Sequence, residues 1–291
     1  MRNIFVFLLI VSYTQVFACD GCNISTGIVN SDPVNYFSFR HRNSYYSGEE
    51  IPFMRHTGNG GQLSEEYFRY DIIAKYFFSK KLYLQSIVSI NQTDVNSLDI
   101  NRKVSGFADP ILFFGYQGFT IYKKWQFNYN LFGGFDLGLG EYNSSLHQEY
   151  SPGSKTSDVM VGSELMARFL NWGMISKLNY KKGFENKYGY QFGQVINTSI
   201  HSGYYHERGN LMYVPLVGLS FESNFIDYNN DKSVRYSSSN VLFADLGMNI
   251  MFSKKLILGG KYQITVFKDV PGWSKLKLDA FELEISYILG K

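Results

Sequence analysis

The sequence predicts an all-β protein, a single closed antiparallel up-and-down transmembrane β-barrel of about twelve strands that follows a cleaved signal peptide. Three observations predict it: apolar and polar residues alternate along most of the chain, the alternating segments are long, and the connections between them are alternately short and long. With 18% aromatic and 18% charged residues, the composition excludes a disordered chain, which has few aromatic residues and many charged ones.

The alternation is clearest in the segment 124–139, where Trp125 and Phe127 alternate with Gln126 and Asn128. A period of two indicates a β-strand with one apolar and one polar face. Many such segments exceed ten residues, and a tilted strand needs about 9–11 residues to cross a membrane. We expect strands near 36–46, 64–79, 82–92, 107–118, 124–139, 157–170, 172–182, 187–203, 210–224, 237–252, 255–268 and 277–289.

The connections support a barrel. Short ones, such as Lys123-Lys124 and 253–255, follow every second strand, while the others include the longer segments 91–101, 141–156 and 227–237. This alternation places tight turns at one end of the sheet and loops at the other, as in outer-membrane barrels. A soluble β-sandwich would also alternate, but it would have shorter strands and no regular difference between its connections.

Closure follows from the hydrogen bonds of the backbone. In hydrocarbon no water is present to pair with a strand edge, and each unpaired group costs several kcal/mol. Only a closed sheet has no edges. We therefore expect the apolar faces to point to lipid and the polar faces to line a lumen.

The first residues predict a signal peptide. Arg2 precedes an apolar run from Ile4 to Val11, which is too short to span a membrane, and Val16-Phe17-Ala18 fits a cleavage site. We divide the chain into a signal peptide (1–18), a Cys-bearing N-terminal segment (19–35) and a barrel (36–291). The expected location is the outer membrane of a Gram-negative bacterium, with both termini in the periplasm.

The two cysteines, Cys19 and Cys22, form a Cys-x-x-Cys at the start of the expected mature chain. Three interpretations stay open. The pair forms a disulfide or has no role, it binds copper or zinc through two thiolates and the free α-amine of Cys19, or Cys19 carries a lipid. No other cofactor is expected.

The polar faces of the predicted strands carry charges of both signs. These either pair and stabilise a plugged interior or line a narrow solvated path that selects a solute. The bulky Phe77, Phe113 and Phe132 are expected to narrow this path. The candidate residues of the solute path are Arg69, Asp71, Lys75, Asp109, Asp136, Glu164, Arg168, Lys177, Asp245, Lys261, Glu282 and Glu284.

Catalysis is not expected. Lipid-hydrolysing barrels carry a His-x-Ser-Asn arrangement, whereas the nearest His–Ser pair here reads His201-Ser202-Gly203. A nucleophilic serine also needs a base and an orienting partner. The formal net charge of +3 is too small to suggest nucleic acid as a partner.

Two short motifs resemble a known family. Residues 104–110 read Val-Ser-Gly-Phe-Ala-Asp-Pro, and residues 151–154, Ser-Pro-Gly-Ser, precede Ser-Asp-Val-Met-Val-Gly at 157–162. Both resemble the recurring elements of the outer-membrane barrel family named after the meta-pathway of phenol degradation. Ala108 stands where that signature has Gly, and 287–291 lacks the usual terminal aromatic residue. The resemblance implies an outer-membrane channel for small aromatic or apolar compounds.

The sequence thus predicts a non-catalytic outer-membrane channel or transporter for small solutes. Its expected partners are outer-membrane lipid, the barrel-assembly machinery and a small-molecule solute. The alternative is a non-conducting outer-membrane protein that binds metal through Cys19 and Cys22. A third hypothesis is a lipid-hydrolysing barrel that uses His201.

Overall fold

The computed structural model describes residues 34–50, 61–97, 101–142, 151–234, 237–271 and 273–290. The predicted signal peptide and the two cysteines lie outside these ranges. Within them, no helix is long and apolar enough to cross a membrane.

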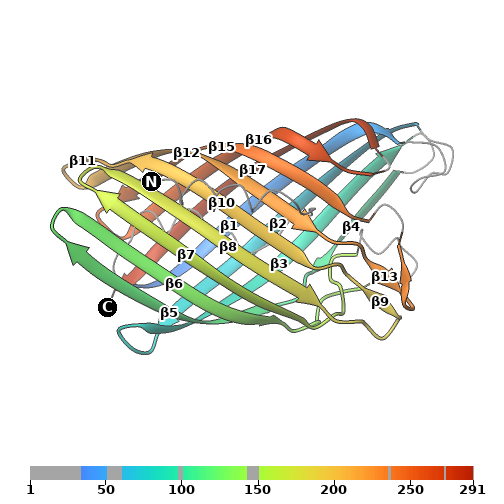
Figure 1. Cartoon of the computed structure of the whole chain (residues 1–291), viewed down its shortest axis with the longest axis horizontal. Helices are drawn as coiled ribbons and strands as arrows, with labels where there is room; N and C mark the ends of the chain where they lie inside the picture. Colours follow the sequence, from blue (N-terminus) through green and yellow to red (C-terminus); the bar gives the residue numbers. More distant parts are fainter. Residues whose placement is uncertain are drawn as a thin grey trace, which may run out of the picture.

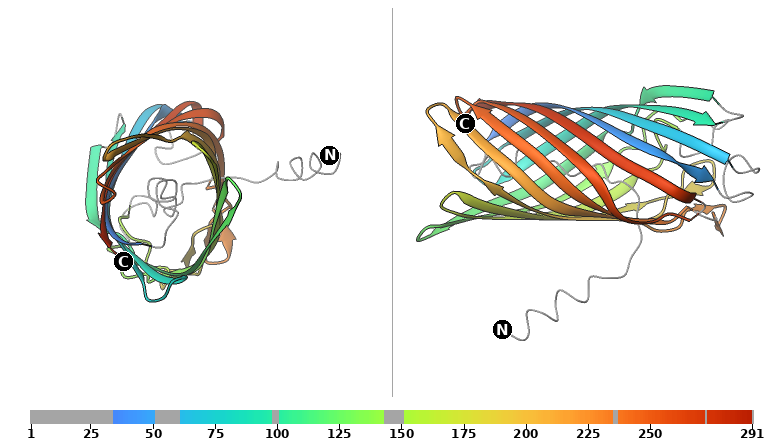
Figure 2. Two further views of the ribbon diagram at one scale, coloured as in Figure 1. Left: turned by 90° about the vertical axis from the view of Figure 1, so that its left-hand side faces the viewer. Right: turned by 90° about the horizontal axis from the view of Figure 1, so that it is seen from above.

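The described strands form one closed barrel (Figures 1 and 2). β1 pairs with β17 and β10 pairs with β12, so that an antiparallel sheet of twelve barrel strands has no free edge. The predicted fold class is confirmed. The barrel strands are β1 (Asn35–Glu50), β2 (Gly61–Phe77), β3 (Leu82–Ser97), β5 (Ile111–Tyr122), β6 (Trp125–Asp136), β7 (Asp158–Phe169), β8 (Trp172–Gly183), β10 (Val195–Tyr204), β12 (Leu211–Asn224), β15 (Ser239–Phe252), β16 (Leu256–Asp269) and β17 (Trp273–Gly290).

Five short strands complete the structure. β4 (Asn101–Phe107) pairs with β3, and β11 (His206–Arg208) pairs with β12. β9 (Tyr190–Gln191), β13 (Tyr228–Asn229) and β14 (Lys232–Ser233) form a small separate sheet among the loops (Figure 1). The described ends of the barrel wall meet, because Asn35 faces Gly290 beside the tight turns.

The two faces of the sheet differ as a membrane barrel requires. Phe39, Leu131 and Ile285 are 43%, 53% and 51% exposed on the outer face. Asp71 and Ser286 are fully buried on the inner face. Large apolar side chains outside and polar ones inside reverse the arrangement of a soluble protein. A soluble sandwich, whose apolar faces would pack together, is therefore ruled out.

The segment 107–118, expected as one strand, is interrupted between β4 and β5. Ile90 of β3 faces Phe107, whereas Ile87 faces Ile111, so the interrupted strand has one residue more than its partner. That is a β-bulge. Its cause is Pro110, which has no N–H to donate to the sheet.

Two other expectations need correction. The segment 91–101, expected as a loop, is mostly paired in the hairpin of β3 and β4, because polar strands continue beyond the apolar band. The strand expected at 187–203 begins only at Val195. Gly189 has a φ of +78°, and a Cβ on Gly193 would lie 1.9 Å from the carbonyl oxygen of Phe225, so both glycines belong to a tightly folded loop.

Apolar side chains also gather on parts of the inner wall. The cluster beside β1 to β7 contains Phe113, whose ring meets Phe132 edge to face at 5.4 Å. The cluster nearer the tight turns consists of Met166, Ile175, Tyr205, Val214, Leu216, Met251, Ile257 and Ile288. The interior is therefore not uniformly polar.

Tyr83 fills the space above Gly115 on the neighbouring strand. A Cβ at Gly115 would lie 2.1 Å from the Tyr83 ring. We expect G115A to lower the free energy of unfolding by about 1–3 kcal/mol, because the ring must leave its position. Urea unfolding in lipid vesicles measures this. G133A is the control, because its nearest atom would be the Met160 carbonyl oxygen at 3.8 Å; equal losses in both variants would contradict the expectation.

Candidate functional site

A network around Asp71 lies on the inner wall. The register of β1, β2 and β3 places Arg40, Asp71 and Ser89 side by side. Arg40 Nε donates to Asp71 Oδ2 at 2.7 Å, and Ser89 Oγ donates to Oδ1 at 2.6 Å. Arg69 Nε also donates to Oδ1 at 2.6 Å. One buried carboxylate thus contacts two guanidinium groups.

Other inner charges also pair with the neighbouring strand. Lys177 Nζ lies 3.0 Å from Glu164 Oε2, and Lys261 Nζ lies 3.9 Å from Glu282 Oε2. In both pairs the two residues face each other in the sheet register. These charges therefore pair along the wall, between neighbouring strands.

His201 points into the barrel. Its Nε2 lies 2.6 Å from Asp245 Oδ2, and Gln263 Nε2 donates to Asp245 Oδ1 at 2.9 Å. Ser202 lies on the opposite face of the strand, where its Oγ donates to the Gly173 carbonyl at 3.4 Å. His201 and Ser202 therefore do not form a nucleophile–base pair.

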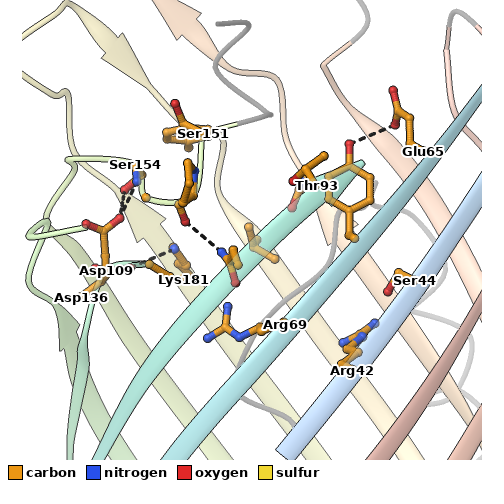
Figure 3. A pocket seen from close by; sticks show the side chains of 18 of the residues that line it. Arg42, Ser44, Glu65, Arg69, Thr93, Asp109, Asp136, Ser151, Ser154 and Lys181 are labelled. Atoms are coloured by element: carbon orange, nitrogen blue, oxygen red, sulfur yellow. Dashed lines mark hydrogen bonds and ion pairs between the residues drawn. The ribbon is translucent and has the colours of Figure 1, made fainter. Parts of the chain in front are cut away.

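A cavity of about 360 Å³ lies at the loop end of the barrel; we call it the vestibule (Figure 3). Arg42 and Arg69 extend into it from β1 and β2, while Asp109, Asp136 and Lys181 lie on another side. Residues of four loops complete its lining, among them Ser154, Phe192, Asp227 and Val270. It thus combines charges of both signs with polar and aromatic groups.

Asp109 holds the loop between β6 and β7 inward. Its carboxylate accepts hydrogen bonds from the backbone N–H of Gly140 at 2.5 Å and from Ser154 Oγ at 2.8 Å, and the Ser154 backbone N–H also donates to it. Asn91 Nδ2 donates to the Pro152 carbonyl at 2.9 Å. The two family-like motifs, 104–110 and 151–154, are therefore in direct contact.

A second set of contacts ties the neighbouring loops together. Asp227 accepts hydrogen bonds from Tyr190 Oη at 2.5 Å and from the Gly193 N–H at 2.6 Å. Asn186 Nδ2 donates to the Ser154 carbonyl at 3.1 Å. Three of the loops that border the vestibule are thus connected to one another.

The structure places the predicted charges as follows. Asp109 lies in the break between β4 and β5, and the others belong to the inner face of their strands. Arg168 lies near the tight turns, 3.3 Å from Glu207, and Glu284 accepts from Ser38 Oγ at 2.7 Å. Only three of them line the vestibule: Arg69, Asp109 and Asp136. The remainder are Asp71, Lys75, Glu164, Arg168, Lys177, Asp245, Lys261, Glu282 and Glu284.

Several inner charged residues were missed. Arg40 and Arg42 alternate with Phe37 and Phe39, so the same period-two rule would have found them. The others are Glu65, Asp158, Lys181 and Glu222.

The metal-site hypothesis concerns Cys19 and Cys22, which lie outside the described residues, and it stays a prediction. Within the described ranges, no group of three or more His, Cys, Asp or Glu residues is placed to hold a metal ion.

The fold is similar to that of an outer membrane channel from Pseudomonas putida F1, with a TM-score of 0.69, 11% identity, and coverage of 92% of this chain and 100% of that one. The chain has the fold of an outer-membrane β-barrel. The β domain of the Bordetella autotransporter BrkA is also similar, with a TM-score of 0.53, 10% identity, and coverage of 88% and 100%. No family model matches the chain, and no curated protein matches it significantly in sequence.

Proposed function

We propose that this protein is an outer-membrane channel for small polar solutes, which enter through the vestibule. The observation that carries the proposal is a cavity of about 360 Å³ at the loop end, lined by Arg42, Arg69, Lys181 and carboxylates. This volume is near the lower end of the range for small-molecule sites. Twelve strands also leave less room than the 16–18 strands of open porins.

The polar inner wall favours a polar solute. Apolar compounds gain nothing from displacing water around charged groups, whereas polar ones can replace that water by hydrogen bonds. The resemblance to the phenol-degradation family implies aromatic or apolar compounds instead. The charged lining supports a polar solute, and the resemblance supports the channel architecture.

The proposal includes a location. An outer-membrane barrel has its short turns in the periplasm and its longer loops outside the cell. By this rule the vestibule opens to the exterior, and Asn35 and Gly290, at the tight-turn end, lie at the periplasmic side. Partners are outer-membrane lipid, the barrel-assembly machinery and the solute.

Conductance through planar bilayers tests the function. We expect the purified barrel to give small, resolved current steps, and we expect E282Q to lower the permeability of cations relative to anions about twofold or more, because a lumen carboxylate is lost. E66Q, whose carboxylate is on the outer face of β2, is the matched control and leaves the permeability ratio unchanged. A wild-type barrel that is inserted but passes no current overturns the proposal.

A further inference from the structure

Lys75 has an unusual place among the inner cations. It lies on the inner face of β2, two residues from the fully buried Ile73, and nearer to the tight turns than to the vestibule. No carboxylate of the described residues lies within ion-pair distance of its ammonium group. Tyr36, which faces Lys75 in the sheet register, belongs to the apolar cluster that contains Ile73 and Ile87.

The other cations of the inner wall show the contrast. Seven of them have a carboxylate within 4.0 Å. The pairs are Arg40–Asp71, Arg42–Glu222, Arg69–Asp71, Arg168–Glu207, Lys177–Glu164, Lys181–Asp158 and Lys261–Glu282.

Neutral groups hold Lys75 instead. Its Nζ lies 3.8 Å from the centre of the Tyr83 ring and 5.1 Å from that of Phe77, and it donates to Gln117 Oε1 at a long 3.4 Å. The Tyr83 hydroxyl is in turn fixed by donation to Asn130 Oδ1 at 2.8 Å. Cation–π contacts of this kind orient an ammonium group but do not neutralise it.

The described charges around Lys75 sum to a positive value. Glu164 and Lys177 are the charged groups that act on Lys75, and they already pair with each other at 3.0 Å. The sum over the three residues is one positive charge. A charge that is largely removed from water is costly unless an opposite charge reaches it.

We propose that Lys75 is the anion subsite of the lumen, at which a singly charged anionic group supplies the missing negative charge. That group is an inorganic anion or the carboxylate of a small organic acid. The inference rests on the proposed channel function and deepens it. With only one full charge and a weak amide contact, the site attracts an anion and still releases it, as conduction requires.

The test compares K75M with the wild type in a chloride gradient across a bilayer. We expect the reversal potential of K75M to shift toward cation selectivity, with the anion-to-cation permeability ratio reduced about threefold or more. K103M removes an exposed lysine of β4, which pairs with Asp94 of β3. This control variant leaves the anion-to-cation permeability ratio unchanged. Replacing chloride by acetate in the wild type distinguishes the two sources, since only a subsite for organic acids passes acetate at a comparable rate.

A second measurement does not depend on conduction. Crystals soaked in bromide should show an anomalous peak beside Lys75 Nζ in the wild type and none in K75M. A peak that persists in K75M is an adventitious ion only and overturns the inference. An unchanged permeability ratio in a folded, conducting K75M also overturns it while the channel function stands. A wild type that binds bromide at Lys75 but passes no current refutes the proposed channel function and leaves the anion subsite standing.

Discussion

Replacing Asp71 by asparagine is expected to lower the free energy of unfolding by about 3–5 kcal/mol, the usual loss when one partner of a buried ion pair is removed. Asp71 is fully buried and accepts hydrogen bonds from Arg40, Arg69 and Ser89. In D71N both guanidinium groups lose the negative charge of Asp71 while they stay inside the barrel. Urea unfolding in lipid vesicles, followed by tryptophan fluorescence, measures the loss.

D94N is the matched control. Asp94 pairs with Lys103 at 3.2 Å, but the lysine side chain is 65% exposed. Exposed pairs contribute about 0–1 kcal/mol, so this variant should be close to the wild type. Similar stabilities of D71N and D94N would show that water reaches Asp71 and that the inner network is hydrated.

Replacing Asp109 by alanine is expected to release the loop between β6 and β7. The carboxylate accepts hydrogen bonds from Gly140 and from the backbone and hydroxyl of Ser154. Hydrogen bonds to a charged group contribute about 1.5–3 kcal/mol each. Losing even two of them changes the equilibrium between held and released loop about a hundredfold or more. Protease cleavage within 137–157 should accelerate accordingly, and single-channel current should become larger and noisier.

D136N serves as the control for this loop. Asp136 lines the same cavity, but from the described residues of this loop it accepts only a long bond, from the Gly138 N–H at 3.3 Å. The protease should therefore cleave D136N within 137–157 at nearly the wild-type rate. If D109A and D136N were cleaved equally slowly, Asp109 would not be what holds the loop.

Much of the fold could be predicted because its signal is local. Phe39 and Ile285 face outward and Asp71 and Glu284 face inward simply because successive side chains of a strand alternate. The break at Pro110 and the late start of β10 were missed. A single bulge or a folded-in loop leaves almost no mark on a period-two pattern.

The candidate site was predictable only in part. Asp109 was identified as an inner charge, yet its role in holding Ser154 depends on 45 residues of intervening chain folding back. Lys75 and Lys177 are indistinguishable as lysines on polar faces, but only Lys177 faces a carboxylate, Glu164, on the next strand.

The alternation of residue types by itself determined the barrel, the direction in which each side chain points and the resulting lipid-facing surface. The tertiary structure decided which charges meet, which loops border the vestibule and that Lys75 has no carboxylate of the described residues within ion-pair distance. The physical reason is register. Sliding a strand by two residues keeps every side chain on the same face of the sheet but changes each of its cross-strand partners. Faces are therefore set along the chain, whereas partners are set only by the packed barrel.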